Sequence, residues 1–217
     1  MSNAMRIYLD VETYRPKKED AFIKEKIISI GVLEDLTPYN KDSLNQIICP
    51  KFFTEWELES ENKVITDFYN YLGDLLANKK PDFIVVVGFN ILRMDIPLLI
   101  QKGVLFEIKS IEELNLLWHN MFVMDLFQVL LPANKYRFKG LRLNNVIKFI
   151  EKQLGCLNVP KVEDHSNEIS LAYEKKKFNS ILKWLKQDLY AVRFLDLSGF
   201  VTKLLEYSIA SDKPLFG

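Results

Sequence analysis

Two carboxylates stand two residues apart in an apolar run near the start of the chain, Ile7 to Thr13. Side chains at positions i and i+2 of a strand point to the same face, so a strand here places Asp10 and Glu12 side by side. Two like charges at that spacing are unfavourable unless a positive charge lies between them. Hard divalent cations are bound by oxygen ligands of this kind. The run therefore predicts a metal site, provided that the fold brings further carboxylates to it.

The composition is typical of one globular domain. The chain has 217 residues, 48% of them hydrophobic, and a formal net charge of zero. A neutral balance excludes a bulk basic field as the basis of nucleic-acid binding, but local basic patches remain open. Ser2, Asn3 and Ala4 before Met5 have the pattern of a cloning scar, so residues 1–4 are set aside and a single domain is predicted over residues 5–217.

The cysteines and the apolar segments bear on location. Cys49 and Cys156 lack the spacing of a metal site, which favours free thiols in a reducing compartment. No segment has the length and apolarity of a membrane span, and no signal-peptide pattern opens the chain. We expect a cytoplasmic protein.

The spacing of apolar residues predicts an α/β fold. Runs rich in β-branched residues predict strands at 5–11, 26–33, 44–49, 83–87 and 121–124. The first three follow one another without a helix, which indicates an antiparallel meander. Apolar positions three and four residues apart predict helices at 61–78, ended by Pro81, and at 95–102, 143–154 and 170–208. We expect a mixed five-stranded sheet, antiparallel first and then parallel, flanked by helices.

Asp95 is the first candidate to join the pair. It lies just past the end of the predicted central strand, and in open α/β sheets ligands gather at the carboxyl ends of strands. An aspartate before a helix is also a common N-cap. Position alone does not decide between a helix cap and a metal ligand.

Asp188 is the second candidate, because it interrupts an apolar helical stripe. Ile181, Leu185, Val192 and Leu195 lie at offsets that share its face. A buried carboxylate is costly unless it is paired or metal-bound. A salt bridge to an arginine or lysine of another element is the alternative to a metal.

These residues fall in motifs that resemble the DEDD superfamily of 3′–5′ exonucleases, and within it the exonuclease domain of family B DNA polymerases. Asp10-Val11-Glu12-Thr13 matches the first motif, and residues 88–97 (Gly-Phe-Asn-Ile-Leu-Arg-Met-Asp-Ile-Pro) look like the second. Residues 140–146 are similar to the stretch after the fifth strand, and Asp188 falls where the third motif places its last carboxylate. The resemblance extends from Met5 to about Leu205.

The resemblance implies a ribonuclease-H-like fold and a metal-dependent exonuclease that degrades single-stranded DNA from its 3′ end. By position, two divalent cations, Mg²⁺ or Mn²⁺, would be held by Asp10, Glu12, Asp95 and Asp188. The candidate substrate contacts beside these carboxylates are Thr13, Phe89, Asn90 and Trp184.

Trp184 departs from the family pattern. The branch usually has tyrosine four residues before the last aspartate, and the sister branch has histidine five residues before it; here these positions hold Trp184 and Lys183. The indole N–H donates but has no acceptor, so it cannot act as a base. His165 lies far upstream in a polar loop and does not fit the histidine motif. The alternatives are an inactive or weakly active module that binds nucleic acid or a repair partner, and an RNA exonuclease.

One further stretch, Lys135 to Lys139, alternates basic and aromatic residues. Such a loop could bind phosphates and stack the bases of a single strand. A solvated surface loop is the alternative, and it is the commoner role of such segments.

Overall fold

The protein is described here by a computed structural model covering residues 4–17, 24–78 and 82–216. Residues 1–3 of the predicted scar, the helix breaker Pro81 and the C-terminal Gly217 lie outside this part of the chain. Within it, none of the helices is both long and apolar enough to cross a membrane. Cys49 and Cys156 are free thiols, as predicted.

The described residues form a mixed five-stranded sheet in the order β3-β2-β1-β4-β5. Its strands are β1 (Ala4–Tyr14), β2 (Lys26–Asp35), β3 (Lys51–Thr54), β4 (Phe83–Gly88) and β5 (Phe122–Asp125). The β1–β2 and β2–β3 pairs are antiparallel, whereas β1–β4 and β4–β5 are parallel. The predicted α/β sheet, a meander followed by parallel strands, is therefore confirmed.

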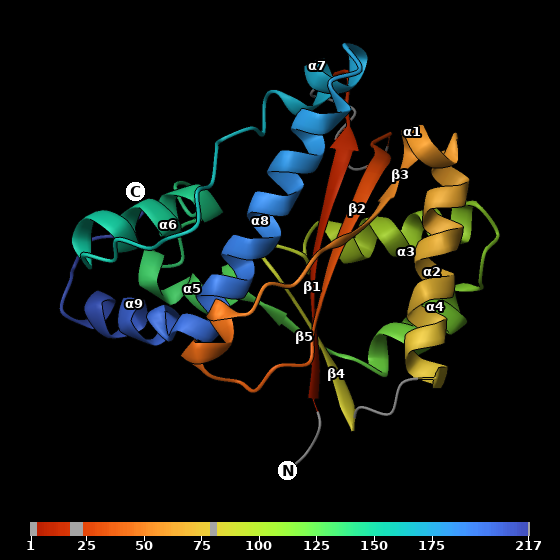
Figure 1. Cartoon of the computed structure of the whole chain (residues 1–217). Helices are drawn as coiled ribbons and strands as arrows, with labels where there is room; N and C mark the ends of the chain where they lie inside the picture. Colours follow the sequence, from red (N-terminus) through yellow and green to blue (C-terminus); the bar gives the residue numbers. More distant parts are fainter. Residues whose placement is uncertain (1–3, 18–23, 79–81, 217) are drawn as a thin grey trace.

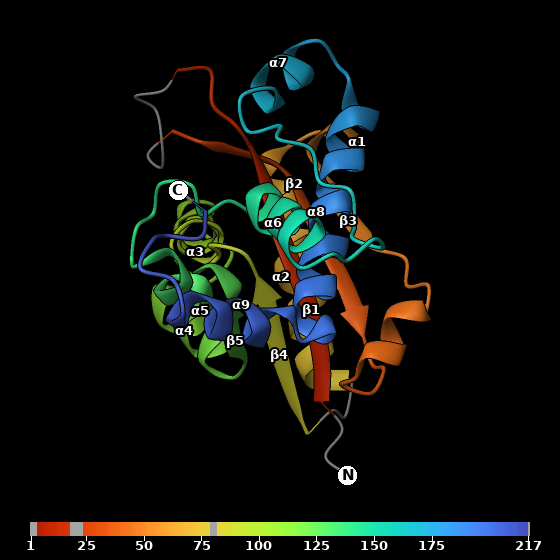
Figure 2. The same ribbon diagram turned by 90° about the vertical axis from the view of Figure 1, so that its left-hand side faces the viewer.

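Helices cover both faces of this sheet (Figures 1 and 2). One face carries α2 (Glu61–Asn78), α3 (Asp95–Leu105) and α4 (Ile111–His119). The other carries α5 (Leu126–Leu130), α6 (Leu143–Gln153), α8 (Phe178–Ser198) and α9 (Phe200–Ile209). Two short helices, α1 (Glu55–Leu58) and α7 (Ile169–Glu174), lie near the end of the sheet where β1 finishes.

The two faces of β1 differ in chemistry. Met5, Ile7 and Leu9 point into the core beneath α2 and α3, and each is about 1% exposed. The alternate side chains face α8, and they are polar: Arg6, Tyr8, Asp10 and Glu12. Because a strand alternates its side chains between two faces, one long strand presents a row of four polar groups to a single helix.

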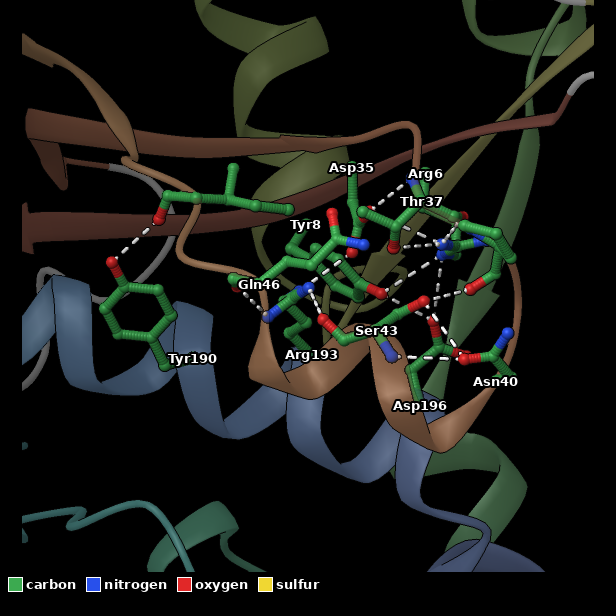
Figure 3. A network of polar contacts seen from close by, with 12 residues as sticks. Arg6, Tyr8, Asp35, Thr37, Asn40, Ser43, Gln46, Tyr190, Arg193 and Asp196 are labelled. Atoms are coloured by element: carbon green, nitrogen blue, oxygen red, sulfur yellow. Dashed lines mark hydrogen bonds and ion pairs between the residues drawn. The ribbon is translucent and has the colours of Figure 1, made fainter.

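A buried network of charges joins the first half of this row to α8 (Figure 3). Arg193 of α8 pairs with Asp35 at 2.8 Å, and Arg6 lies 3.5 Å from the other oxygen of Asp35. Tyr8 donates a hydrogen bond of 2.8 Å to Asp196, which lies 3.8 Å from Arg6. These contacts fix the position of α8 along β1.

The predicted third strand, 44–49, is wrong. Residues Lys41–Asn45 form a 3-10 helix, η2, whose N-cap Asn40 accepts a hydrogen bond from the Ser43 amide at 3.1 Å. Arg193 stabilises this turn by donating to the Ser43 carbonyl at 2.6 Å. The strand forms only after Pro50, as β3, where it pairs with β2. A buried arginine 150 residues away therefore contributes to the structure of this segment.

The helix predictions need smaller corrections. The helix at 61–78 is confirmed as α2, but α3 continues through Gly103 to Leu105 instead of stopping at residue 102. A Cβ at Gly103 would lie 2.8 Å from Leu114 and 2.9 Å from Tyr69, so this glycine serves close helix packing rather than termination. The region 170–208 divides into α7, α8 and α9, and α4 lies where no element is predicted.

Candidate metal centre

Asp10 and Glu12 stand on the α8 side of β1, as their spacing predicts. Asp10 pairs across the strands with Gly31 of β2. A Cβ at Gly31 would lie 2.8 Å from Leu185 and 2.9 Å from Leu189, so the glycine lets α8 pack close to the sheet at this level. The strand register shifts directly after Glu12, and such bulges re-aim side chains beside functional sites.

Asp188 reaches the same place from α8. The apolar stripe around it is buried as predicted: Ile181, Leu185 and Leu195 are 0% exposed. The alternative, an arginine or lysine partner, is not what the structure shows. Within the described residues the ion-pair partner of Asp188 is His165, whose Nε2 lies 3.4 Å from Oδ2.

Asp95 enters from the start of α3 and is 7% exposed. The N-cap position of α3 is held by Met94, and no side chain caps the helix there. The N-cap alternative for Asp95 is therefore not supported. Burial is the main cause of the raised pKa of Asp95, and the charge of Glu12 adds to it, so the Asp95 carboxyl lies near Glu12.

The four carboxylates lie close enough for their charges to interact. Burial raises the pKa of Asp188 to about 7, and the charge of Glu12 adds to the rise. Burial likewise raises the pKa of Asp95 to about 8. The pKa of Asp10 is raised well above its ordinary value by burial first, and then by the charges of Asp188, Glu12 and Asp95. Like charges held together in a poorly solvated place are each harder to ionise.

His165 belongs to this cluster, although sequence spacing places it outside. Its Nε2 lies 3.2 Å from Oε1 of Glu12 as well as near Asp188, and the three ligand atoms lie within 4.8 Å of one another. Burial alone would lower the pKa of His165, but the adjacent carboxylates of Glu12 and Asp188 raise it to about 9. The loop between α6 and α7 returns to the site and delivers this ring from 23 residues before Asp188.

Trp184 holds the histidine in place. The two rings stack with centroids 5.3 Å apart and planes within 4°. The indole Nε1 donates to Glu163 Oε2 at 3.0 Å, and the Glu163 carbonyl lies 3.0 Å from His165 Nδ1. Lys183 also binds Glu163, at 2.6 Å. The tryptophan at the motif position therefore packs against a histidine that comes from a loop. The spacing of the motifs does not reveal this histidine.

A pocket of about 350 Å³ opens beside the cluster. His165 and Asp188 form part of its wall, together with Phe89 and Asn90, two of the predicted substrate contacts. The other two are placed differently: Thr13 follows the bulge of β1, and Trp184, 8% exposed, packs in a separate core behind His165. Contact with substrate stays a prediction for all four residues.

Asp125, at the end of β5, is a positioning residue that the sequence reasoning missed. Its carboxylate accepts hydrogen bonds from the amides of Asn90 at 2.7 Å, Leu92 at 3.0 Å and Phe127 at 3.0 Å. Asn90 has a left-handed backbone, with φ of 68°. The buried aspartate thus fixes the turn that carries Phe89 and Asn90 to the pocket.

No protein-family model matches the sequence, and no curated protein matches it either. Solved structures do resemble the fold. The family B DNA polymerase of the archaeon Pyrobaculum calidifontis superposes over 97% of this chain, with a TM-score of 0.60 and 13% identity. Escherichia coli exonuclease I, in its zinc-bound complex with single-stranded DNA, superposes over 94%, with a TM-score of 0.53 and 13% identity.

At this level of identity the likeness shows the fold alone, a ribonuclease-H-like α/β fold shared with these structures. The chain spans 26% of the polymerase chain and 42% of the exonuclease I chain.

Proposed function

We propose that this protein is a metal-dependent 3′–5′ exonuclease that hydrolyses phosphodiester bonds at the ends of single-stranded DNA. The observation that carries the proposal is the convergence of four carboxylates, Asp10, Glu12, Asp95 and Asp188, from three elements. Within the described residues neither arginine nor lysine forms an ion pair with any of them. A site of this charge needs cations from outside the chain.

The residues present fit divalent cations. Asp188 Oδ1 is a buried oxygen without a hydrogen-bond donor, although buried polar atoms are normally satisfied, and Glu12 Oε1 has His165 Nε2 beside it at 3.2 Å without a well-aligned hydrogen bond. Carboxylate oxygens are the ligands that Mg²⁺ and Mn²⁺ prefer, so the four carboxylates would hold two such ions. When bound, the pair would supply positive charge to the attacking and leaving oxygens of the displacement and lower the pKa of the attacking water.

His165 would handle the proton of that water. Its Nδ1 faces the Glu163 carbonyl, so in the neutral ring the hydrogen sits on Nδ1 and Nε2 is free to accept. Nε2 points to Glu12 and Asp188 at the pocket wall. Neutralising those carboxylates would lower the raised pKa of His165 and favour the accepting form. This ring would therefore supply the function that Trp184 cannot.

The pocket would receive the terminal nucleotide. Phe89 lines it as an aromatic surface for a base, and Asn90 Oδ1 is a buried acceptor without a donor. Single-stranded DNA is the preferred substrate class because the motif resemblance is to DNA exonucleases and because exonuclease I, of the same fold, was solved with single-stranded DNA. RNA is the alternative substrate, and the digestion below compares it with DNA. DNA repair in the cytoplasm is the proposed setting of the activity.

The test is digestion of single strands labelled at either end, DNA and RNA in parallel, with Mn²⁺, Mg²⁺ or EDTA. We expect stepwise loss from the 3′ end that requires metal, and a loss of activity of about a thousandfold in Asp10→Asn. Asp67→Asn is the matched control, since Asp67 is exposed on α2 away from the cluster.

Equal digestion by Asp10→Asn and the wild type would overturn the site assignment. Failure to degrade any DNA or RNA would overturn the activity. Binding of strands without turnover would instead support the alternative of an inactive binding module.

A further inference from the structure

A ledge of stacked side chains leads from the pocket to the protein surface. Phe127 and Phe138 stack with centroids 5.9 Å apart and planes within 10°. The guanidinium carbon of Arg93 lies 4.4 Å from the Phe138 ring centre and 5.7 Å from that of Phe127. Phe89 meets Phe127 edge-on at 5.7 Å, and both line the pocket. We call Arg93, Phe127 and Phe138 the aromatic ledge.

The outer part of the ledge is open to solvent and positively charged. Phe138 is 57% exposed, so its ring is accessible to a ligand. Arg93, Arg137 and Lys139 are exposed, and none of them forms an ion pair within the described part of the chain. Flat surfaces beside unpaired cations suit a ligand that has both planar bases and phosphates.

The loop that carries Phe138 is held in one shape. The side-chain amide of Asn134, 0% exposed, donates to the carbonyls of Arg137 and Lys139, the latter at 3.1 Å. Its oxygen accepts from the Phe216 amide at 3.0 Å. A loop fixed in advance loses little conformational entropy when a ligand binds, which favours a binding surface over a freely solvated loop.

We propose that the aromatic ledge binds the single strand next to the nucleotide in the pocket, with a base stacked on Phe138 and Arg93 and the backbone phosphates near Arg93, Arg137 and Lys139. The inference rests on the proposed function, because the pocket gives the strand its end point. It adds a second binding position along the strand, so short and long oligonucleotides should depend on the ledge differently.

The test measures binding of fluorescein-labelled dT12 by fluorescence anisotropy in EDTA, where turnover cannot consume the probe. Phe138→Ala should weaken binding about tenfold, the loss of one base stack. Phe122→Ala is the matched control: Phe122 is 66% exposed and packs edge-on against Phe83 at the start of β5, whereas Phe127 of the ledge follows the other end of that strand. It should bind dT12 as the wild type does.

Two further readouts separate stacking from charge and from folding. Arg93→Ala should lower the slope of log affinity against log salt by about 0.7, and Phe138→Ala should leave that slope unchanged. The mononucleotide thymidine 5′-monophosphate, used as a competitor, fills only the pocket, so Phe138→Ala should bind it like the wild type.

Unchanged binding of dT12 by Phe138→Ala, or an equal loss in Phe122→Ala, overturns the ledge. If the wild type still degrades strands with Mn²⁺ in that case, the proposed exonuclease function stands. If the wild type neither binds dT12 nor degrades any strand, both proposals fall together.

Discussion

The two ends of the interface between β1 and α8 bury carboxylates beside different numbers of cationic side chains. At the end nearest the start of β1, Asp35 and Asp196 meet Arg6 and Arg193, two acids against two bases (Figure 3). Burial tends to raise the pKa of Asp35, but hydrogen bonds from Thr37 and Arg193 bring it below its ordinary value. The chain supplies its own counter-charges here.

At the other end the chain supplies far less. Four carboxylates gather there, Asp10, Glu12, Asp95 and Asp188. His165 contacts two of them, Glu12 and Asp188, and carries at most one positive charge. The pKa of Asp188 rises to about 7 and that of Asp95 to about 8, because burial and like charges act together.

We call the end with Arg6 and Arg193 the closed end and the end with Asp10 and Asp188 the open end. The contrast shows that the open end lacks arginine and lysine partners in the described chain. At the first end β1 and α8 each provide an arginine, Arg6 and Arg193, for the buried acids. The interface can therefore accommodate buried arginines. Since no arginine or lysine pairs with the four carboxylates in the described chain, we infer that their counter-charge comes from divalent cations.

The largest effect should come from breaking the closed end. Asp35→Asn leaves Arg6 and Arg193 with one carboxylate between them, and removing one partner from a buried ion pair costs about 3–5 kcal/mol. Urea denaturation would measure the loss against Asp67→Asn, an exposed change expected to alter stability by less than about 0.5 kcal/mol. Equal stabilities for the two variants would show that the closed end does not depend on charge balance.

The same substitution at the open end should have the opposite sign. Without metal at pH 8, Asp188→Asn removes one of four crowded charges and should raise the free energy of unfolding by about 2 kcal/mol. Urea denaturation in EDTA would measure it. A destabilisation as large as that of Asp35→Asn would mean that Asp188 is a paired structural charge and not a metal ligand.

The pH dependence of stability gives a smaller and graded test. The folded pKa values of Asp188 and Asp95 lie above those of the unfolded chain, so between pH 4 and pH 8 the folded protein holds protons that the unfolded chain has released. His165, with a folded pKa of about 9, acts in the same direction above pH 6.5.

The metal-free protein should therefore lose stability as pH rises from 5 to 8.5, by about 3 kcal/mol or roughly 8 °C in Tm. Differential scanning calorimetry in EDTA would show it, and Mn²⁺ should restore Tm most at high pH, because cations replace protons on the same carboxylates. A Tm that rises with pH in EDTA would contradict the arrangement.

The sequence predicts the sheet well because local patterns specify it. The i and i+2 spacing of Asp10 and Glu12, and the apolar stripe around Asp188, depend only on strand and helix geometry. The 3-10 helix at Lys41–Asn45 could not be predicted, because Arg193, which is distant in the sequence, donates a hydrogen bond to its Ser43 carbonyl.

The candidate site shows the same division. The carboxylates lie on regular elements at motif spacing, so the sequence places them. His165 lies on an irregular loop, and its position depends on the stack with Trp184 and the contacts of Glu163. Asp125 acts through three backbone amides that no side-chain pattern reveals.

The most direct test of the metal centre is a Mn²⁺ titration at pH 8, followed by the electron paramagnetic resonance signal of the free ion. We predict that the wild type binds two Mn²⁺ per chain, that Asp10→Asn loses at least one of them, and that Asp67→Asn binds as the wild type does. A wild-type protein that binds no Mn²⁺, or an Asp10→Asn variant that binds as much as the wild type, would contradict the central claim that these carboxylates are a cation site.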